Sequence, residues 1–230
     1  MSSEVRYDSI ELARDDRTRH ALRRALGFVL FLHAAWILEL ALESRIVWMT
    51  TSGARFAYWT VMKLLLWVAP AVALLHASGQ RLRDVLGFHR LRSIVLWGGG
   101  AGLIFAASAL IARAIGHRPL FAPHFGWPFI GGVIVAPIVE EITFRGAVLP
   151  TLLMRFRFPA ANTLTAVFFL GIHLPGWYFQ HRLSDMLMQP VSGALSILII
   201  GWALGLVAYK SKSVTASTLT HILNNLFSIS

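Results

Sequence analysis

The chain has no cysteine and few charged residues. The absence of cysteine excludes disulfide bonds, thiol nucleophiles and cysteine-ligated zinc. Charged residues make up 14% of the 230 residues, against about 25% in a typical soluble domain, whereas hydrophobic residues make up 56%. One core cannot bury that much apolar surface in a chain of this length, and a disordered chain would be polar and highly charged. The composition therefore predicts a protein whose solvent is lipid.

Acidic residues are scarcer than basic ones. There are 11 Asp and Glu against 21 Lys and Arg, which gives a formal net charge of +10. In a soluble protein this excess would point to nucleic acid. Here the basic residues lie between apolar runs, where membrane proteins carry cytoplasmic Lys and Arg. We therefore expect membrane lipids, and no nucleic acid, among the partners.

Apolar runs recur from residue 25 to the C-terminus. A straight crossing of a bilayer needs about 20 residues, and the runs predict spans at residues 25–42, 56–77, 93–115, 127–153, 161–175, 189–209 and 214–229. The predicted fold class is all-α, a polytopic transmembrane helix bundle with an eighth segment if 127–153 forms two helices. The predicted parts are a juxtamembrane tail (1–24), N-terminal transmembrane helices (25–126) and a transmembrane core with the candidate site (127–230).

The distribution of basic residues predicts the orientation of the chain. If seven spans alternate across the membrane, fourteen Lys and Arg outside the spans share the side of the N-terminus and five lie on the other side. Cytoplasmic loops carry the excess of Lys and Arg, so we expect a cytoplasmic N-terminus. Gly201 and Gly205 have the spacing of a helix dimer motif, but we favour packing within the chain and leave the oligomeric state open.

Ionisable residues inside apolar spans are costly and are functional candidates by default. Glu140, Glu141 and Arg145 all lie in the run 127–153. At about 100° per residue, Glu141 and Arg145 lie about 40° apart on a helix, which favours an ion pair. Glu140 lies about 140° from Arg145. The spacing predicts one carboxylate paired structurally and a second left free for chemistry.

Two later spans add imidazole and amide groups. His173 follows Phe169 by four residues and Asn225 follows His221 by four, so each pair shares a helix face. These groups suit water-mediated hydrolysis, with Glu140 as general base and His173 holding the water or shuttling a proton. His221 and Asn225 would donate hydrogen bonds to a developing oxyanion. The predicted site therefore consists of four catalytic residues and two supporting ones: Glu140, His173, His221 and Asn225, with Glu141 and Arg145.

The depth of the candidate residues in the membrane is uneven. Glu140 and His221 fall in the middle of their predicted spans, whereas His173 lies near the outer end of the short span 161–175. A tilted or broken helix in this span would bring His173 inward; otherwise the predicted boundary of the span is wrong. Four other ionisable residues have no partner at helical spacing and are assigned no chemistry: His33, Glu39, Lys63 and His76.

Three motifs in the C-terminal half resemble those of the CAAX prenyl endopeptidase type II family, also called the CPBP or Abi family of intramembrane glutamic proteases. The family motifs Glu-Glu-x-x-x-Arg, Phe-x-x-x-His and His-x-x-x-Asn begin here at Glu140, Phe169 and His221. The resemblance covers residues 127–229. It implies helices around an intramembrane cavity, in which the first two motifs activate water and the third supports the oxyanion.

The resemblance also implies an activity and a class of substrate. It implies a glutamate-type intramembrane peptidase that acts on a peptide or protein, and we assign it no cofactor and no metal ligands. Members of the family cleave prenylated C-terminal tails in eukaryotes, and many bacterial members process peptides or serve in bacteriocin self-immunity. We therefore expect an integral protein of a prokaryotic cell membrane whose substrate is a lipidated or otherwise membrane-associated peptide.

Three other functions stay open at this point. A non-catalytic membrane partner or bacteriocin immunity protein would use the same fold, and its binding would survive Glu140→Ala. A proton-coupled transporter would use Glu140, His173 and Arg145 as a relay, although no inverted repeat is visible. A zinc hydrolase would use a Glu and two His, although the His-Glu-x-x-His spacing is absent.

Overall fold

The computed structural model describes residues 3–43, 45, 51–117, 119–121, 124–190 and 193–229, without the side chains of residues 3–17 and 229. All regular secondary structure in these residues is helical, and none of them lies in a strand. The all-α prediction is therefore confirmed. The side chains of most of the predicted tail, 1–24, lie outside the described residues.

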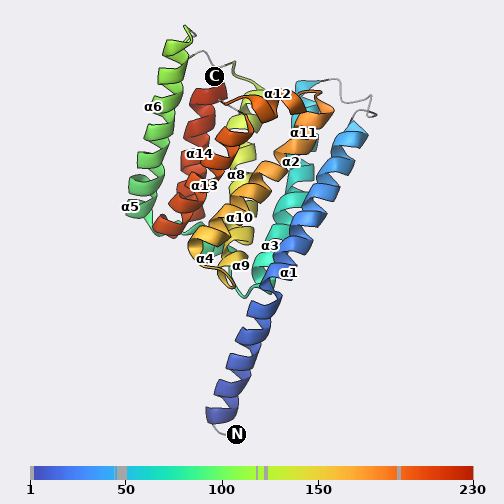
Figure 1. The fold of residues 1–230 in the computed structure, drawn as a ribbon, viewed down its shortest axis with the longest axis vertical. Coiled ribbons are helices and arrows are strands. Elements are labelled where there is room, and N and C mark those ends of the chain that lie inside the picture. Colours follow the sequence, from blue (N-terminus) through green and yellow to red (C-terminus); the bar gives the residue numbers. More distant parts are fainter. Residues whose placement is uncertain are drawn as a thin grey trace.

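The helices run up and down one bundle (Figure 1). The first half contains α1 (Ser3–Glu43), then the continuous run of α2 (Ser52–Lys63), the π-helix η1 (Leu64–Val68) and α3 (Ala69–Ala77). The short α4 (Leu82–Leu86) leads to a second run of α5 (Leu91–Ser93), η2 (Ile94–Gly99) and α6 (Gly100–Ile115). The second half begins with the run of α7 (Trp127–Ile130), η3 (Gly131–Val135), α8 (Ala136–Glu141), η4 (Ile142–Val148) and α9 (Leu149–Leu153). It continues with α10 (Phe158–Gly171), α11 (His173–Phe179), α12 (Leu183–Met188), α13 (Ala194–Ser211) and α14 (Val214–Ile229).

Helical runs occupy each of the predicted spans. Within the described residues, five runs are long and apolar enough to cross a membrane: Thr18–Glu43, Ser52–Ala77, Leu91–Ile115, Phe158–Phe179 and Ala194–Ser211. The other two predicted spans, 127–153 and 214–229, are helices with the predicted bounds. Since Trp127–Leu153 is one uninterrupted helical run, the two-helix alternative that would add an eighth segment does not occur there.

Two predicted spans, 161–175 and 189–209, were wrong at three of their boundaries. The predicted span 161–175 is too short, because α10 begins at Phe158 and the helical segment continues through α11 to Phe179. The predicted span 189–209 begins too early, because α13 starts at Ala194, and residues 191 and 192 lie outside the described residues.

Widened π-helical turns precede three prolines inside the long helical runs. The segments η1, η3 and η4 each end two residues before a proline, at Pro70, Pro137 and Pro150 respectively. Proline lacks a backbone N–H and its ring clashes with the carbonyl four residues earlier, so the regular helical hydrogen bond is lost. A π-helical turn takes up the mismatch and the helix continues. Because η4 follows Glu141 directly, the helix widens at the candidate acids.

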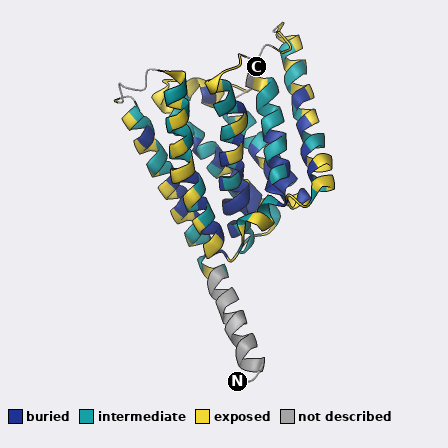
Figure 2. Cartoon of the chain, turned by 180° about the vertical axis from the view of Figure 1, so that it is seen from behind, coloured by how far each residue is buried: buried dark blue, intermediate teal, exposed yellow. Residues whose placement is uncertain are grey.

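Exposed residues lie on the outer faces of the bundle (Figure 2), and many of them are large and apolar. On α6, the exposed fraction of Leu103 and Ile104 is 67%, and that of Ile115 is 75%. Soluble monomers rarely expose apolar patches of this kind. Lipid is the medium that suits these faces, so the chain is an integral membrane protein.

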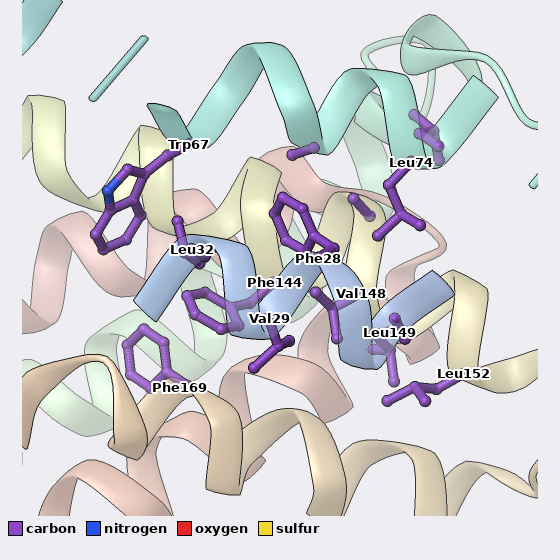
Figure 3. Close-up of a cluster of buried hydrophobic side chains, with 14 of the residues drawn as sticks. Phe28, Val29, Leu32, Trp67, Leu74, Phe144, Val148, Leu149, Leu152 and Phe169 are labelled. Carbon is purple, nitrogen blue, oxygen red and sulfur yellow. The ribbon is translucent and has the colours of Figure 1, made fainter. Parts of the chain in front are cut away.

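A cluster of buried apolar side chains joins the N-terminal helices to η4 and α10 (Figure 3). Leu32 of α1 and Phe144 of η4 are both fully buried in it. The Phe144 ring meets that of Phe169 edge to face, with the centroids 5.3 Å apart, a geometry that aromatic pairs prefer. This cluster fixes the position of Phe169, which belongs to the second motif.

Glycines let α14 lie directly against η2 and α6. A Cβ atom added at Gly98 would stand 2.6 Å from the carbonyl oxygen of Ala216, and one at Gly102 would strike the side chain of Leu223. Thr220 Oγ1 donates a hydrogen bond of 2.9 Å to the Gly98 carbonyl. Small residues allow such close approach of helix backbones in lipid. The position of α14, and of the third motif on it, therefore depends on these contacts.

We expect Gly98→Val to lower the free energy of unfolding by about 1–3 kcal/mol, because the added side chain meets backbone that cannot yield without moving α14. The matched control is Gly99→Val in the same π-helix, where an added Cβ meets nothing within 4 Å. Thermal unfolding in detergent compares the two variants. Equal losses of stability would contradict the packing argument.

Gly201 and Gly205 also serve packing within the chain. A Cβ atom at Gly201 would lie 3.1 Å from Phe169 Cδ1, and one at Gly205 would strike the side chain of Asn162. Both contacts are with α10, so the favoured interpretation of this spacing is confirmed.

Candidate active site

The three segments that carry the predicted site residues meet inside the bundle. Helix α14 packs against α8 and against both π-helices of that run, and α10 packs against η4 and continues into α11. Glu140 and Glu141 therefore come from α8, His221 and Asn225 from α14, and His173 from the first position of α11.

Glu141 is fully buried and holds two partners. Its Oε1 accepts a hydrogen bond of 2.9 Å from Arg145 Nη1 and another of 3.0 Å from His221 Nδ1. The predicted ion pair one turn apart is therefore present. The contact between Glu141 and His221, which are 80 positions apart, was not predicted. Helical spacing cannot reveal such a contact, since it depends on how α8 and α14 pack.

Arg145 connects α8 to two further helices. Its Nη2 donates a hydrogen bond of 2.6 Å to the carbonyl oxygen of Gly201 on α13. Its guanidinium carbon lies 4.4 Å from the centroid of the Phe169 ring on α10, a cation–π contact. Its exposed fraction is 2%, so Glu141 supplies the counter-charge and these two contacts add to it, while Nε has no hydrogen-bond partner.

The two contacts of His221 define the roles of its ring nitrogens. An ionised carboxylate only accepts hydrogen bonds, so Nδ1 carries a proton and donates to Glu141 Oε1. Nε2 faces the other acid, with Glu140 Oε2 at 4.0 Å. His221 thus lies between both glutamates and presents Nε2 to the unpaired one.

His173 is fixed in a similar way by backbone. Its Nδ1 donates a hydrogen bond of 2.7 Å to the carbonyl oxygen of Phe169, which leaves Nε2 for the site. The His173 and His221 rings lie 4.9 Å and 6.0 Å from the Phe169 ring, measured between centroids. His173 also interacts electrostatically with Glu140. The two imidazoles and the free carboxylate therefore belong to one site.

The depth of His173 is explained by the helical segment that α10 and α11 form. The chain turns at Ile172 between α10 and α11, so the expected break is present. The helical segment then continues to Phe179. His173 thus lies within the span rather than near its end, because the predicted end at residue 175 was too early.

Asn225 makes a contact that the sequence did not predict. Its Nδ2 donates a hydrogen bond of 2.9 Å to the carbonyl oxygen of Gly132 in η3, and its Oδ1 accepts one of 3.0 Å from Asn224. One amide hydrogen of Asn225 thus ties α14 to η3. The second amide hydrogen is the one that a role toward an oxyanion would use.

Glu140 is the acid without a hydrogen bond among the described residues. Its side chain is 13% exposed, and its carboxylate interacts electrostatically with Lys63 at the end of α2. Sequence reasoning assigned Lys63 no chemistry, because it has no partner at helical spacing. A lysine inside an apolar span is itself a functional candidate, and by that criterion the sequence would have indicated Lys63.

The arrangement offers a carboxylate without a hydrogen bond among the described residues, and two imidazole Nε2 atoms, in a largely buried setting. These are the groups that general acid–base chemistry on a bound water requires. Within the part of the chain that the structure describes, no three His, Asp or Glu side chains are grouped so as to hold a metal ion.

Comparison with protein-family models matches residues 122–227 to the family described as Rce1-like, type II CAAX prenyl endopeptidase. The matched region covers the helices from α7 to α13 and most of α14. No curated protein and no solved structure matches the chain.

Proposed function

Because residues 122–227 belong to the Rce1-like family of type II CAAX prenyl endopeptidases, we propose that this chain is an intramembrane glutamic peptidase. It hydrolyses a peptide bond near the C-terminus of a lipidated or membrane-associated peptide. The observation that carries the proposal is the meeting of an unpaired Glu140 with His221, and its electrostatic interaction with His173, on three different helices.

In this mechanism Glu140 is the general base. It takes a proton from a water that His173 Nε2 helps to hold, and the water oxygen attacks the carbonyl carbon of the scissile bond. The carbon–nitrogen bond then breaks, and Glu140 returns the proton to the leaving amine. Oxygen from water thus appears in the new carboxylate, and no covalent intermediate forms.

His221 and Asn225 stabilise the negative oxygen of the tetrahedral intermediate. Glu141 holds the proton on His221 Nδ1, so Nε2 donates to the oxyanion when the ring is protonated on both nitrogens. The remaining amide hydrogen of Asn225 supplies a second donor. Loss of one such donor lowers kcat by roughly 10²–10³ in other hydrolases.

Product mass spectrometry in ¹⁸O-labelled water tests this function. Membranes carrying the chain are incubated with a farnesylated peptide that ends in Cys-Val-Ile-Met, beside membranes carrying Glu140→Ala. We expect a truncated peptide with one ¹⁸O in its new carboxylate, formed by the unaltered chain alone and in the presence of strong chelators. Product that carries only ¹⁶O after a single turnover would instead assign Glu140 a nucleophilic role.

The same experiment separates the competing functions. If no product differs between the two membranes across lipidated and unlipidated probes, the peptidase proposal fails. Peptide binding that persists in Glu140→Ala without cleavage by either chain would indicate a non-catalytic partner or immunity protein. Proton flux in sealed vesicles that Glu140→Ala abolishes would indicate a transporter.

We also propose a cytoplasmic N-terminus in a prokaryotic cell membrane. The proposal is supported by the excess of fourteen Lys and Arg on the N-terminal side over five on the other side. Reporter fusions at the two ends of the chain should show opposite accessibility.

A further inference from the structure

Lys63 carries a charge inside the span Ser52–Ala77 without an ion pair. Its Nζ lies 5.9 Å from the ring centroid of Trp36 and 6.0 Å from that of Trp67. Among the described residues it makes no hydrogen bond or salt bridge, and Glu140 acts on it only electrostatically. A cation in an apolar span is retained at a cost, so an anionic partner is expected for it.

Lys63 lines a cavity of about 530 Å³ between α2 and the run α7–η3–α8. Thr51 lines one end of this cavity and Lys63 the other, which are about 18 Å apart at the rise of an α-helix. Buried Trp67 lies one turn beyond Lys63 and is not part of the lining. On this helix the lining therefore ends at Lys63, which places a cation at the inner end of the cavity.

The walls of the cavity suit a peptide tail with apolar side chains. The Phe56 and Trp127 rings stack with 4.9 Å between their centroids, and Trp59 lines the same space. Arg55 also lines it, but Arg55 Nε pairs with Glu43 Oε1 at 3.4 Å. Of the two cations that line this cavity, Lys63 is thus the one without a carboxylate at salt-bridge distance among the described residues.

We propose that Lys63 binds the free C-terminal carboxylate of the peptide substrate. The inference rests on the proposed peptidase function, and it names the group by which the substrate is positioned. A peptide terminus that enters this cavity along α2 reaches Lys63 at the inner end of the lining, and a carboxylate is the terminus that an ammonium group attracts.

The dimensions of the cavity agree with this placement. An extended chain advances about 3.3–3.6 Å per residue, so about 18 Å holds roughly five residues. Ala136 lines the inner end of the cavity, and Glu140 follows one turn later on the same helix. The end of the cavity that holds Lys63 is therefore the end that lies toward Glu140, and a bond cleaved close to the bound carboxylate releases a short C-terminal peptide.

A matched pair of probes tests the proposal. The farnesylated peptide ending in Cys-Val-Ile-Met is prepared with a free C-terminal carboxylate and with a C-terminal amide. Binding and cleavage of both are measured on the full chain in nanodiscs, for the unaltered protein, Lys63→Met and Lys63→Arg. Lys210→Met is the control, because Lys210 is an exposed lysine outside this cavity.

We expect the unaltered chain and Lys210→Met to prefer the acid over the amide by about 10- to 100-fold, the range of a hydrogen bond to a charged group. Lys63→Met should lose this preference by binding the acid more weakly while the amide is unchanged, and Lys63→Arg should retain part of it. An unchanged preference in Lys63→Met would overturn the proposal. Equal losses for both peptides would also overturn it, since Lys63 would then act through Glu140.

The binding arm keeps this inference separate from the peptidase proposal. If the unaltered chain cleaves neither peptide but binds the acid in a manner that depends on Lys63, the carboxylate site stands and the hydrolytic function fails. If both peptides are cleaved at equal rates and bound equally, the hydrolytic function stands and the carboxylate site fails.

Discussion

Arg145→Leu should lower the free energy of unfolding by about 3–5 kcal/mol. Removal of one partner of a buried ion pair leaves the other charge uncompensated, and that penalty has this size in other proteins. Here the remaining charge would be Glu141, whose side chain has no exposed surface. The variant would also lose the hydrogen bond to Gly201 and the contact with the Phe169 ring. Denaturant or thermal unfolding in detergent measures the effect.

The double variant Glu141→Leu with Arg145→Leu is the control for this prediction. It removes both charges, so it should be less destabilised than Arg145→Leu even though two side chains are changed. If the double variant lost as much unfolding free energy as the two single variants together, the pair would not be coupled. That result would contradict the assignment of Glu141 and Arg145 as one structural unit.

The fold and the local part of the site follow from sequence patterns. Long apolar runs determine where helices cross a membrane, since every backbone group must be satisfied within its own segment there. The ion pair of Glu141 and Arg145 is equally local, because residues four apart on a helix are neighbours. Even η1, η3 and η4 carry a sequence signal, in the prolines at positions 70, 137 and 150, whereas η2 has no such proline.

Contacts between helices could not be predicted in the same way. His221 reaches Glu141 because α14 packs closely against η2 at Gly98, and no periodicity within one helix encodes that arrangement. The same holds for Asn225, which bonds to the Gly132 carbonyl. Lys63 approaches Glu140 only through the packing of α2 and η1 beside α8. The sequence thus indicates which groups are unusual, and the helix packing decides which of them meet.

Replacing each of the two adjacent glutamates by glutamine should separate catalysis from stability. Glu140→Gln keeps the shape of the side chain but removes the proton acceptor, so kcat for the farnesylated probe should fall by about 10²–10⁴. Its unfolding midpoint should stay close to that of the unaltered chain, because Glu140 has no hydrogen bond to lose among the described residues.

Glu141→Gln, unlike Glu140→Gln, should lower the stability of the protein as well as its activity. The amide cannot neutralise Arg145, so the unfolding midpoint should fall. This loss of stability is independent of any effect on catalysis. Activity should fall as well, because an amide holds the Nδ1 proton of His221 less strongly than a carboxylate does. The two variants are compared by kcat and thermal midpoint on the same preparation. If Glu140→Gln lost stability and kept its turnover, the division of labour between the free and the paired carboxylate would be wrong, and with it the assignment of Glu140 as the base.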